Sequence, residues 1–173
     1  MILKMAASTA ILGGCGYLGI MFGTCYKKRA QQIGEFRNAL KQLEFDVDFL
    51  SITLCESFEK IVSSSSNGVK QVFTYVLKRL RENRCADMEK CWDYALKMYG
   101  SELYITAEDK KILTDFAKNL GTGNREKEMN NIKAADMRLK VAEDEAHAEA
   151  KKNSKMYRGL GFLCGIFLVI VLV

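Results

Sequence analysis

The sequence contains no proline and a single histidine, and these two scarcities narrow the choice of fold and function. Proline interrupts helices because it lacks a backbone N–H and clashes with the preceding turn, so a chain without it can form long ones. Together with abundant leucine, lysine, glutamate and alanine, the absence of proline predicts an all-α helical bundle. The one histidine, His147, stands among acidic residues, and we expect it on a solvated helix face rather than in a catalytic or metal site.

Charge is absent from both ends of the chain, because residues 5–26 and 159–173 contain no charged side chain. The first run is long enough to cross a hydrocarbon core of roughly 30 Å at ~1.5 Å per helical residue. Counted from Met156, the second run reaches about 27 Å, which is short but adequate. We therefore predict three domains: an N-terminal transmembrane helix in 1–26, a helical bundle in 27–155, and a C-terminal transmembrane helix in 156–173.

Each apolar run is bordered by basic residues on the side that faces the middle of the chain. These membrane-flanking residues are Lys27, Lys28 and Arg29 after the first run, and Lys151, Lys152, Lys155 and Arg158 before the second. Basic residues stay on the cytoplasmic side of a membrane, so the middle domain should be cytoplasmic and both termini outside. The same residues suit anionic lipid headgroups, whereas no basic stripe with interleaved aromatic residues indicates nucleic acid.

A cleaved export signal is the alternative reading of the N-terminal run. The stretch Leu12-Gly13-Gly14-Cys15 resembles a lipoprotein processing box, which would lipidate Cys15 and export the rest of the chain. The apolar run continues well beyond Cys15, and the heavier positive charge follows it, both of which oppose cleavage and export. Both runs also carry a GxxxG pattern, Gly19–Gly23 and Gly161–Gly165, which favours helix packing within the membrane or a homo-oligomer.

The six cysteines predict neither a disulfide framework nor a metal site. Three belong to the apolar runs or their edges, and Cys55, Cys85 and Cys91 belong to the predicted cytoplasmic part, where thiols stay reduced. Cys85 and Cys91 are not at the spacing of zinc ligands. The sequence also lacks a phosphate-binding glycine loop and a nucleophile elbow, so we predict no enzyme and no cofactor.

Residues 28–61 show one sustained helical period, with apolar side chains at steps of three and four. The pattern predicts one uninterrupted helix buried against its own domain, with the apolar residues Ile33, Phe36, Leu40, Leu43, Val47, Leu50, Leu54, Phe58 and Ile61. An intermolecular coiled coil on the same face is the alternative, and it would make the chain a membrane-anchored structural protein.

Shorter helices are predicted after a polar turn at 63–68, and the first two cover 69–83 and 87–99. Trp92, the only tryptophan, falls on the apolar face of the second helix and is expected in the core.

Two more helices complete the predicted bundle. Thr106 and Asp109 form a capping-box pattern at the start of one, and Gly121 supplies its stop. The last begins near Asn124 and carries the narrow, alanine-rich stripe Ile132, Ala135, Leu139, Ala142, Ala146 and Ala150. Small residues permit close approach, so we expect this helix to pack antiparallel to the first long one.

The loops at Ser63–Gly68 and Gly100–Thr106 are the predicted partner-binding region, because we expect them at the end of the bundle farthest from the bilayer. The candidate residues are Ser63, Ser64, Ser65, Ser66, Asn67, Ser101, Glu102 and Tyr104.

Four stretches carry a resemblance to a known family. They are Arg37–Glu44 (RNALKQLE), Cys91–Leu96 (CWDYAL), Thr106–Asp109 (TAED) with the following Leu113, Phe116, Leu120 and Gly121, and the tail from Lys155 to Val173. In this order, over nearly the whole chain, they resemble the stage III sporulation protein AB family. The chain departs from the family pattern at Ile52-Thr53-Leu54, where members often have Thr-Pro-Leu, and at Asn124, where they often have an aspartate.

The resemblance implies a bundle similar to the cytoplasmic domains of type II secretion F platform proteins. It also implies a membrane scaffold of the secretion-like complex between mother cell and forespore, on the mother-cell side in the outer forespore membrane. The implied partners are the AA-like ATPase of that complex and its other subunits.

The basic residues beside the two apolar runs predict the topology. A reporter fused after Val173 should appear outside the mother-cell cytoplasm, and one inserted at Ser64 should appear inside it. Changing Lys27, Lys28 and Arg29 together to glutamate should impair or invert insertion, because the charge bias that orients the first span is then lost. Digestion of the middle domain by protease added to intact cells would contradict this topology.

Overall fold

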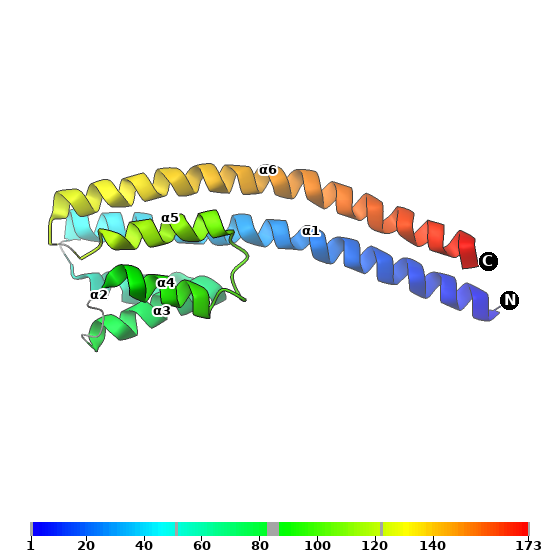
Figure 1. Ribbon diagram of the computed structural model, residues 1–173, viewed down its shortest axis with the longest axis horizontal. Helices are drawn as coiled ribbons and strands as arrows, with labels where there is room; N and C mark the ends of the chain where they lie inside the picture. The colour runs from blue at the N-terminus through cyan, green and yellow to red at the C-terminus, as the bar shows by residue number, and fades with distance from the viewer. Residues whose placement is uncertain (1, 51, 83–86, 122, 173) are drawn as a thin grey trace. The chain divides into compact units, whose positions relative to one another are not determined.

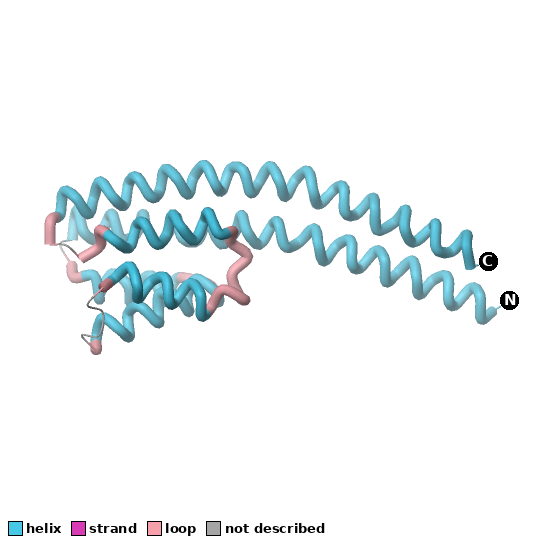
Figure 2. Tube along the Cα trace, viewed as in Figure 1, coloured by secondary structure: helices cyan, strands magenta, loops and turns pink. Residues whose placement is uncertain are grey.

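The computed structural model describes the backbone of residues 2–50, 52–82, 87–121 and 123–172. For most positions in 2–23 and 154–172, the description covers the backbone alone. The chain forms α1 (Ile2–Phe45), a π-helix η1 (Asp46–Leu50), α2 (Leu54–Ser64), α3 (Asn67–Arg81), α4 (Met88–Met98), α5 (Ala107–Lys118) and α6 (Arg125–Leu172), in the order shown in Figure 1. The described residues contain no strand (Figure 2), which confirms the predicted all-α class.

The chain divides into two compact units. Unit 1 contains Met1–Ala30 with Glu145–Val173, and unit 2 contains Gln31–Asp144. Among the described residues, no helix is both long and apolar enough to cross a bilayer. Most of the predicted spans, 5–26 and 156–173, lies outside the described side chains.

The core of unit 2 is built around four large aromatic side chains from four helices. Phe58, Phe73, Trp92 and Phe116 are all at most 1% exposed. The Trp92 ring lies 5.2 Å from Phe73 and 5.8 Å from Phe116 between centroids, both edge-on, which is a favourable aromatic geometry. Trp92 is therefore a core residue, as its position on the helical pattern predicts.

The uninterrupted helix predicted for 28–61 is wrong. Helix α1 ends at Phe45, η1 follows, and α2 begins at Leu54. Thr53 and Glu56 start α2 with a reciprocal capping box, in which the Thr53 hydroxyl accepts from the Glu56 N–H and the Glu56 carboxylate accepts from the Thr53 N–H. The Thr53 N–H and the Thr53 hydroxyl both lie within hydrogen-bond distance of the Glu56 carboxylate, and these two contacts lower the pKa of Glu56 below its ordinary value.

Burial explains why the apolar period hides this break. Phe58 and Ile61 continue the stripe on α2 because α2 returns to the same core, but Leu50 in η1 is 48% exposed. Asp46, at the start of η1, is fully buried and accepts hydrogen bonds at 3.0 Å from Gln42 and Lys60. An unbroken helix would need Leu50 buried as part of the apolar stripe. At the break, the buried side chain is instead Asp46, which is held by hydrogen bonds.

The predicted turn at 63–68 is also shorter than expected. Helix α2 extends to Ser64 and α3 begins at Asn67. The hydroxyls of Ser63, Ser64 and Ser65 donate to the carbonyls of Lys60 and Ile61, which are among the last acceptors of α2. The serines therefore finish the helix, since side-chain donors satisfy carbonyls that have no partner further along it.

The later helices agree with the sequence pattern. Thr106 and Asp109 form the predicted capping box of α5, and Asp109 is buried. All six residues of the predicted stripe on α6 are buried. Gly121 and Gly123 have φ of +77° and +74°, the left-handed region that glycine adopts most readily, and they turn the chain from α5 into α6.

Candidate interaction surfaces

An ion-pair network joins α1 to α6 within unit 2. Arg37 Nε donates to Asp136 Oδ1 at 2.9 Å, and a second nitrogen of the same guanidinium bonds to Glu143. The three side chains are only 14%, 21% and 19% exposed. The hydrogen bond to Asp136 is the largest cause of the raised pKa of Arg37, and burial opposes it, so this arginine is held as a cation.

A weaker pair further along the helices fixes their relative direction. Glu44 of α1 lies 3.8 Å from Lys133 of α6, whereas Arg37, earlier on α1, pairs with the later residues Asp136 and Glu143. Higher residue numbers on α1 therefore face lower residue numbers on α6. The two helices are therefore antiparallel within unit 2, as the alanine-rich stripe predicts. At the far end, Arg125 of α6 bonds to the backbone carbonyl of Asp48 and thereby ties the start of α6 to the α1–α2 break.

The residues predicted to flank a membrane belong to unit 1. Lys27, Lys28, Lys151 and Lys152 are exposed, and Arg29 forms an ion pair with Glu149 at 2.9 Å. The side chains of Lys155 and Arg158 lie outside the described ones. His147 is exposed on α6, as the surrounding acidic residues predict.

Both loops predicted to bind a partner are fastened to α1. The Gln32 side chain donates to the Glu102 carbonyl at 3.0 Å and accepts from the Tyr104 N–H at 2.6 Å. The Glu35 carboxylate accepts from the hydroxyl and the N–H of Ser66. The structure therefore brings the two loops together at the same stretch of α1.

Their position differs from the predicted one. Gln32 and Glu35 follow Arg29 closely in sequence, so the loops lie where α1 enters unit 2. The opposite end of unit 2 holds the α1–α2 break and the turn into α6, which Arg125 joins. The expectation that the two loops mark the end farthest from the basic residues is wrong, because the sequence does not show that α2 folds back along α1.

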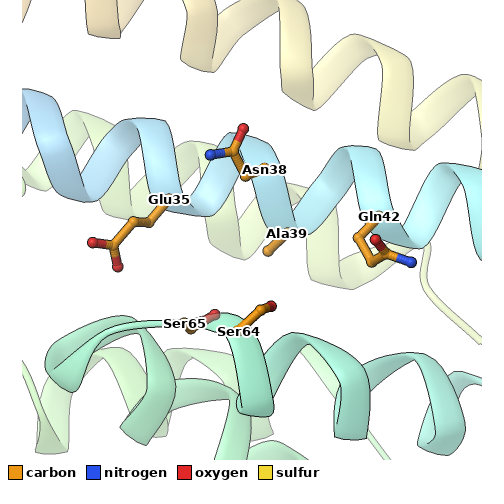
Figure 3. Close-up of a pocket in the computed structure, with 6 residues that line it drawn as sticks. All are labelled: Glu35, Asn38, Ala39, Gln42, Ser64 and Ser65. Carbon is orange, nitrogen blue, oxygen red and sulfur yellow. The ribbon is translucent and has the colours of Figure 1, made fainter.

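The remaining candidate residues divide between surface and groove. Ser63 and Ser101 are exposed, and the Asn67 side chain lies outside the described ones. Ser64 and Ser65 line a groove of about 170 Å³ together with residues of α1. Figure 3 shows Ala39 of α1 facing the two serines. The residues that line the groove are Glu35, Asn38, Ala39, Gln42, Ser64 and Ser65. Its one charged lining group, Glu35, is already bonded to Ser66. The groove can form hydrogen bonds with a polar group, but it pairs no nucleophile with a base.

A second surface, on α3 and α4, was missed by the sequence analysis. We call it the α3–α4 patch and define it as Tyr75, Arg79, Tyr94, Met98 and Tyr99. The Tyr75 and Tyr94 rings are stacked, with centroids 5.5 Å apart and planes at 29°. The Arg79 guanidinium lies 5.3 Å from the Tyr75 centroid and donates to the Tyr75 hydroxyl at 3.1 Å. Tyr94 and Met98 are 55% and 56% exposed, although both are large and apolar.

The described part of the chain thus defines an all-α bundle with polar and aromatic contact surfaces, in which no group of three or more histidine, cysteine, aspartate or glutamate residues could hold a metal ion. The family Stage III sporulation protein AB matches residues 4–173. The chain is 27% identical to the Stage III sporulation protein AB of Bacillus subtilis (strain 168) over 171 residues, which cover 98% of this chain and 99% of that protein. It therefore belongs to the stage III sporulation protein AB family, as the four stretches of sequence indicate.

A solved structure of a Stage III sporulation protein AB shares the fold. Its TM-score against this chain is 0.64 at 23% identity, and the match covers 71% of this chain and 96% of the solved one. The chain is thus a member of a sporulation family whose fold is all-α.

Arg37 should be more important for stability than any exposed arginine of α6. Arg37→Met should lower the free energy of unfolding by about 1.5–3 kcal/mol, because two largely buried carboxylates lose their shared charged donor. Arg138 is a matched control, since it pairs with Asp115 at 3.3 Å while its own side chain is 51% exposed and that of Asp115 is half-buried, at 35%. Arg138→Met should cost no more than about 0.5 kcal/mol.

Urea unfolding of the two variants in detergent, followed by far-ultraviolet circular dichroism, measures both costs. Equal destabilisation by Arg37→Met and Arg138→Met would show that the Arg37 network contributes no more than a surface pair.

Proposed function

We propose that this chain is a membrane platform subunit of the secretion-like complex between mother cell and forespore. It would recruit and position the cytoplasmic AA-like ATPase of that complex, without chemistry of its own. Family membership supports a role in sporulation, since the chain matches a sporulation family over residues 4–173. The proposed location is the outer forespore membrane on the mother-cell side, with residues 27–155 in the cytoplasm and both termini outside.

The observation that carries the proposal is the antiparallel pairing of α1 and α6. Arg37, Asp136 and Glu143 hold the two helices together within unit 2, and both helices continue towards the uncharged ends of the chain. If those ends span the membrane, two separate anchors restrict the orientation of the bundle more than one could. A partner bound to the bundle then stays near the bilayer at a raised effective concentration.

The architecture also supports the proposed likeness to type II secretion F cytoplasmic domains, in which a helical bundle is a contact surface. Helices α2 to α5 form a compact layer with a shared aromatic core, which gives a rigid body for docking. Rigid surfaces lose little conformational entropy on binding. The described residues offer contact surfaces and no paired catalytic groups, so binding is the activity that they support.

Reconstitution tests the platform directly. The full chain in lipid nanodiscs should bind the purified AA-like ATPase, and empty nanodiscs should not. ATP hydrolysis should require the ATPase and should be absent from nanodiscs that contain this chain alone. Failure of the ATPase to bind the reconstituted chain, or nucleotide turnover by the chain itself, would contradict the proposal.

A structural coiled-coil protein is the competing function, and the same preparation separates the two. It predicts self-association through the apolar face of 28–61 in place of ATPase binding. In the structure this face is buried within unit 2 at Ile33, Phe36, Leu40 and Leu43, which leaves it unavailable to a second chain.

A further inference from the structure

We propose that the α3–α4 patch is the docking surface for the ATPase, and that its counterpart on the ATPase is an acidic surface. This inference rests on the proposed platform function and deepens it. The patch consists of Tyr75, Arg79, Tyr94, Met98 and Tyr99, all within unit 2. It is distinct from the two loops on α1, whose polar groups are already bonded to Gln32 and Glu35.

Four of the five patch side chains contact one another. Tyr75 stacks on Tyr94, lies 6.4 Å from Tyr99 between centroids, and holds Arg79 by a hydrogen bond and a cation–π contact. The side chains are thus fixed on two packed helices, and ordering them on binding costs little. Tyrosine, arginine and methionine are also the residues enriched at the centres of protein interfaces.

Of the two helices that carry the patch, α3 is basic and α4 has no net charge. Helix α3 carries Lys70, Lys78, Arg79 and Arg81 and no acidic residue. Arg81 pairs with Glu59 across to α2, and on α4 Lys97 pairs with Asp93. Within the described part of the chain, Lys70 and Lys78 form no ion pair, and both are exposed. The hydrogen bond to Tyr75 is the largest cause of the raised pKa of Arg79, and the Glu82 carboxylate also raises it.

Charge complementarity therefore selects an acidic partner surface. The exposed ring of Tyr94 offers such a surface an apolar contact, and the exposed lysines of α3 offer it charge-assisted hydrogen bonds. The combination explains why Tyr94 and Met98 are exposed although helices α3 and α4 bury comparable side chains, such as Phe73 and Trp92.

Two other kinds of partner fit the patch less well. A single strand of nucleic acid needs free ring faces on which bases stack, but the Tyr75 ring is already covered by Tyr94 and Arg79. A bilayer surface needs clustered lysines beside the membrane, and the exposed Lys27, Lys28, Lys151 and Lys152 of unit 1 already supply them. Protein is therefore the partner that the geometry favours.

Matched variants of the full chain in nanodiscs of neutral lipid test the assignment. Tyr94→Ala changes the patch itself and Lys78→Glu changes the exposed lysine next to Arg79 in α3; both are called patch variants below. Lys140→Glu and Met137→Ala change exposed residues on α6 and are the controls. Each patch variant should weaken ATPase binding by about tenfold or more, because central interface residues carry most of the affinity. The controls should stay within roughly twofold, and the loss caused by Lys78→Glu should shrink as salt rises.

The outcomes separate this inference from the platform itself. If the wild-type chain does not bind the ATPase, the proposed function fails and this inference fails with it. If the wild type binds and the patch variants bind as well as the controls, the α3–α4 patch is the wrong surface although the platform stands. Circular dichroism checks folding, and Lys78→Glu is decisive if Tyr94→Ala disturbs α4.

A lipid arm completes the test. Anionic vesicles added to the neutral nanodiscs should bind the Lys78→Glu variant and the wild type equally. If the patch variants instead lose vesicle binding and keep ATPase binding, the patch contacts lipid and the protein assignment is overturned.

Discussion

The shared contact of one arginine with two carboxylates organises unit 2. Arg37 on α1 reaches both Asp136 and Glu143 on α6, and all three side chains are largely withdrawn from water. Such a network costs desolvation energy unless every charge finds its partner, so it tolerates only a narrow range of helix registers. The alanine-rich stripe of α6 then lets α1 approach closely, and the register and direction of the pair follow.

The short helices depend on this pair in turn. Gln32 and Glu35 of α1 hold the loops that lead into α3 and α5, while Asp46 and Arg125 hold the other end of the unit. While the loops are engaged by α1, the surface of α3 and α4 carries exposed aromatic and basic side chains such as Tyr94 and Lys78. One layer that supports and another that is open to contact is the arrangement that the proposed platform role requires.

Much of this architecture could be predicted from the sequence, because amphipathic periods and caps act locally. The capping box of α5, the core position of Trp92 and the buried stripe of α6 all followed from such patterns. The break after Phe45 could not, because its cap at Thr53 lies inside an apolar period that continues in phase on α2. The α3–α4 patch joins two helices, so only the Tyr94 and Met98 spacing and the all-basic charge of α3 hinted at it.

The central claim is that α1 and α6 are paired antiparallel when the chain is in a membrane. Spin labels on a cysteine-free chain in bilayers test it most directly, with one label at Lys133 and the other at Glu44 or at Gln31. Double electron–electron resonance should give a short distance between the labels at 44 and 133. The distance between the labels at 31 and 133 should be longer by roughly 15–20 Å, since α1 rises ~1.5 Å per residue. A 31–133 distance as short as the 44–133 distance would contradict the pairing, and with it the platform built upon it.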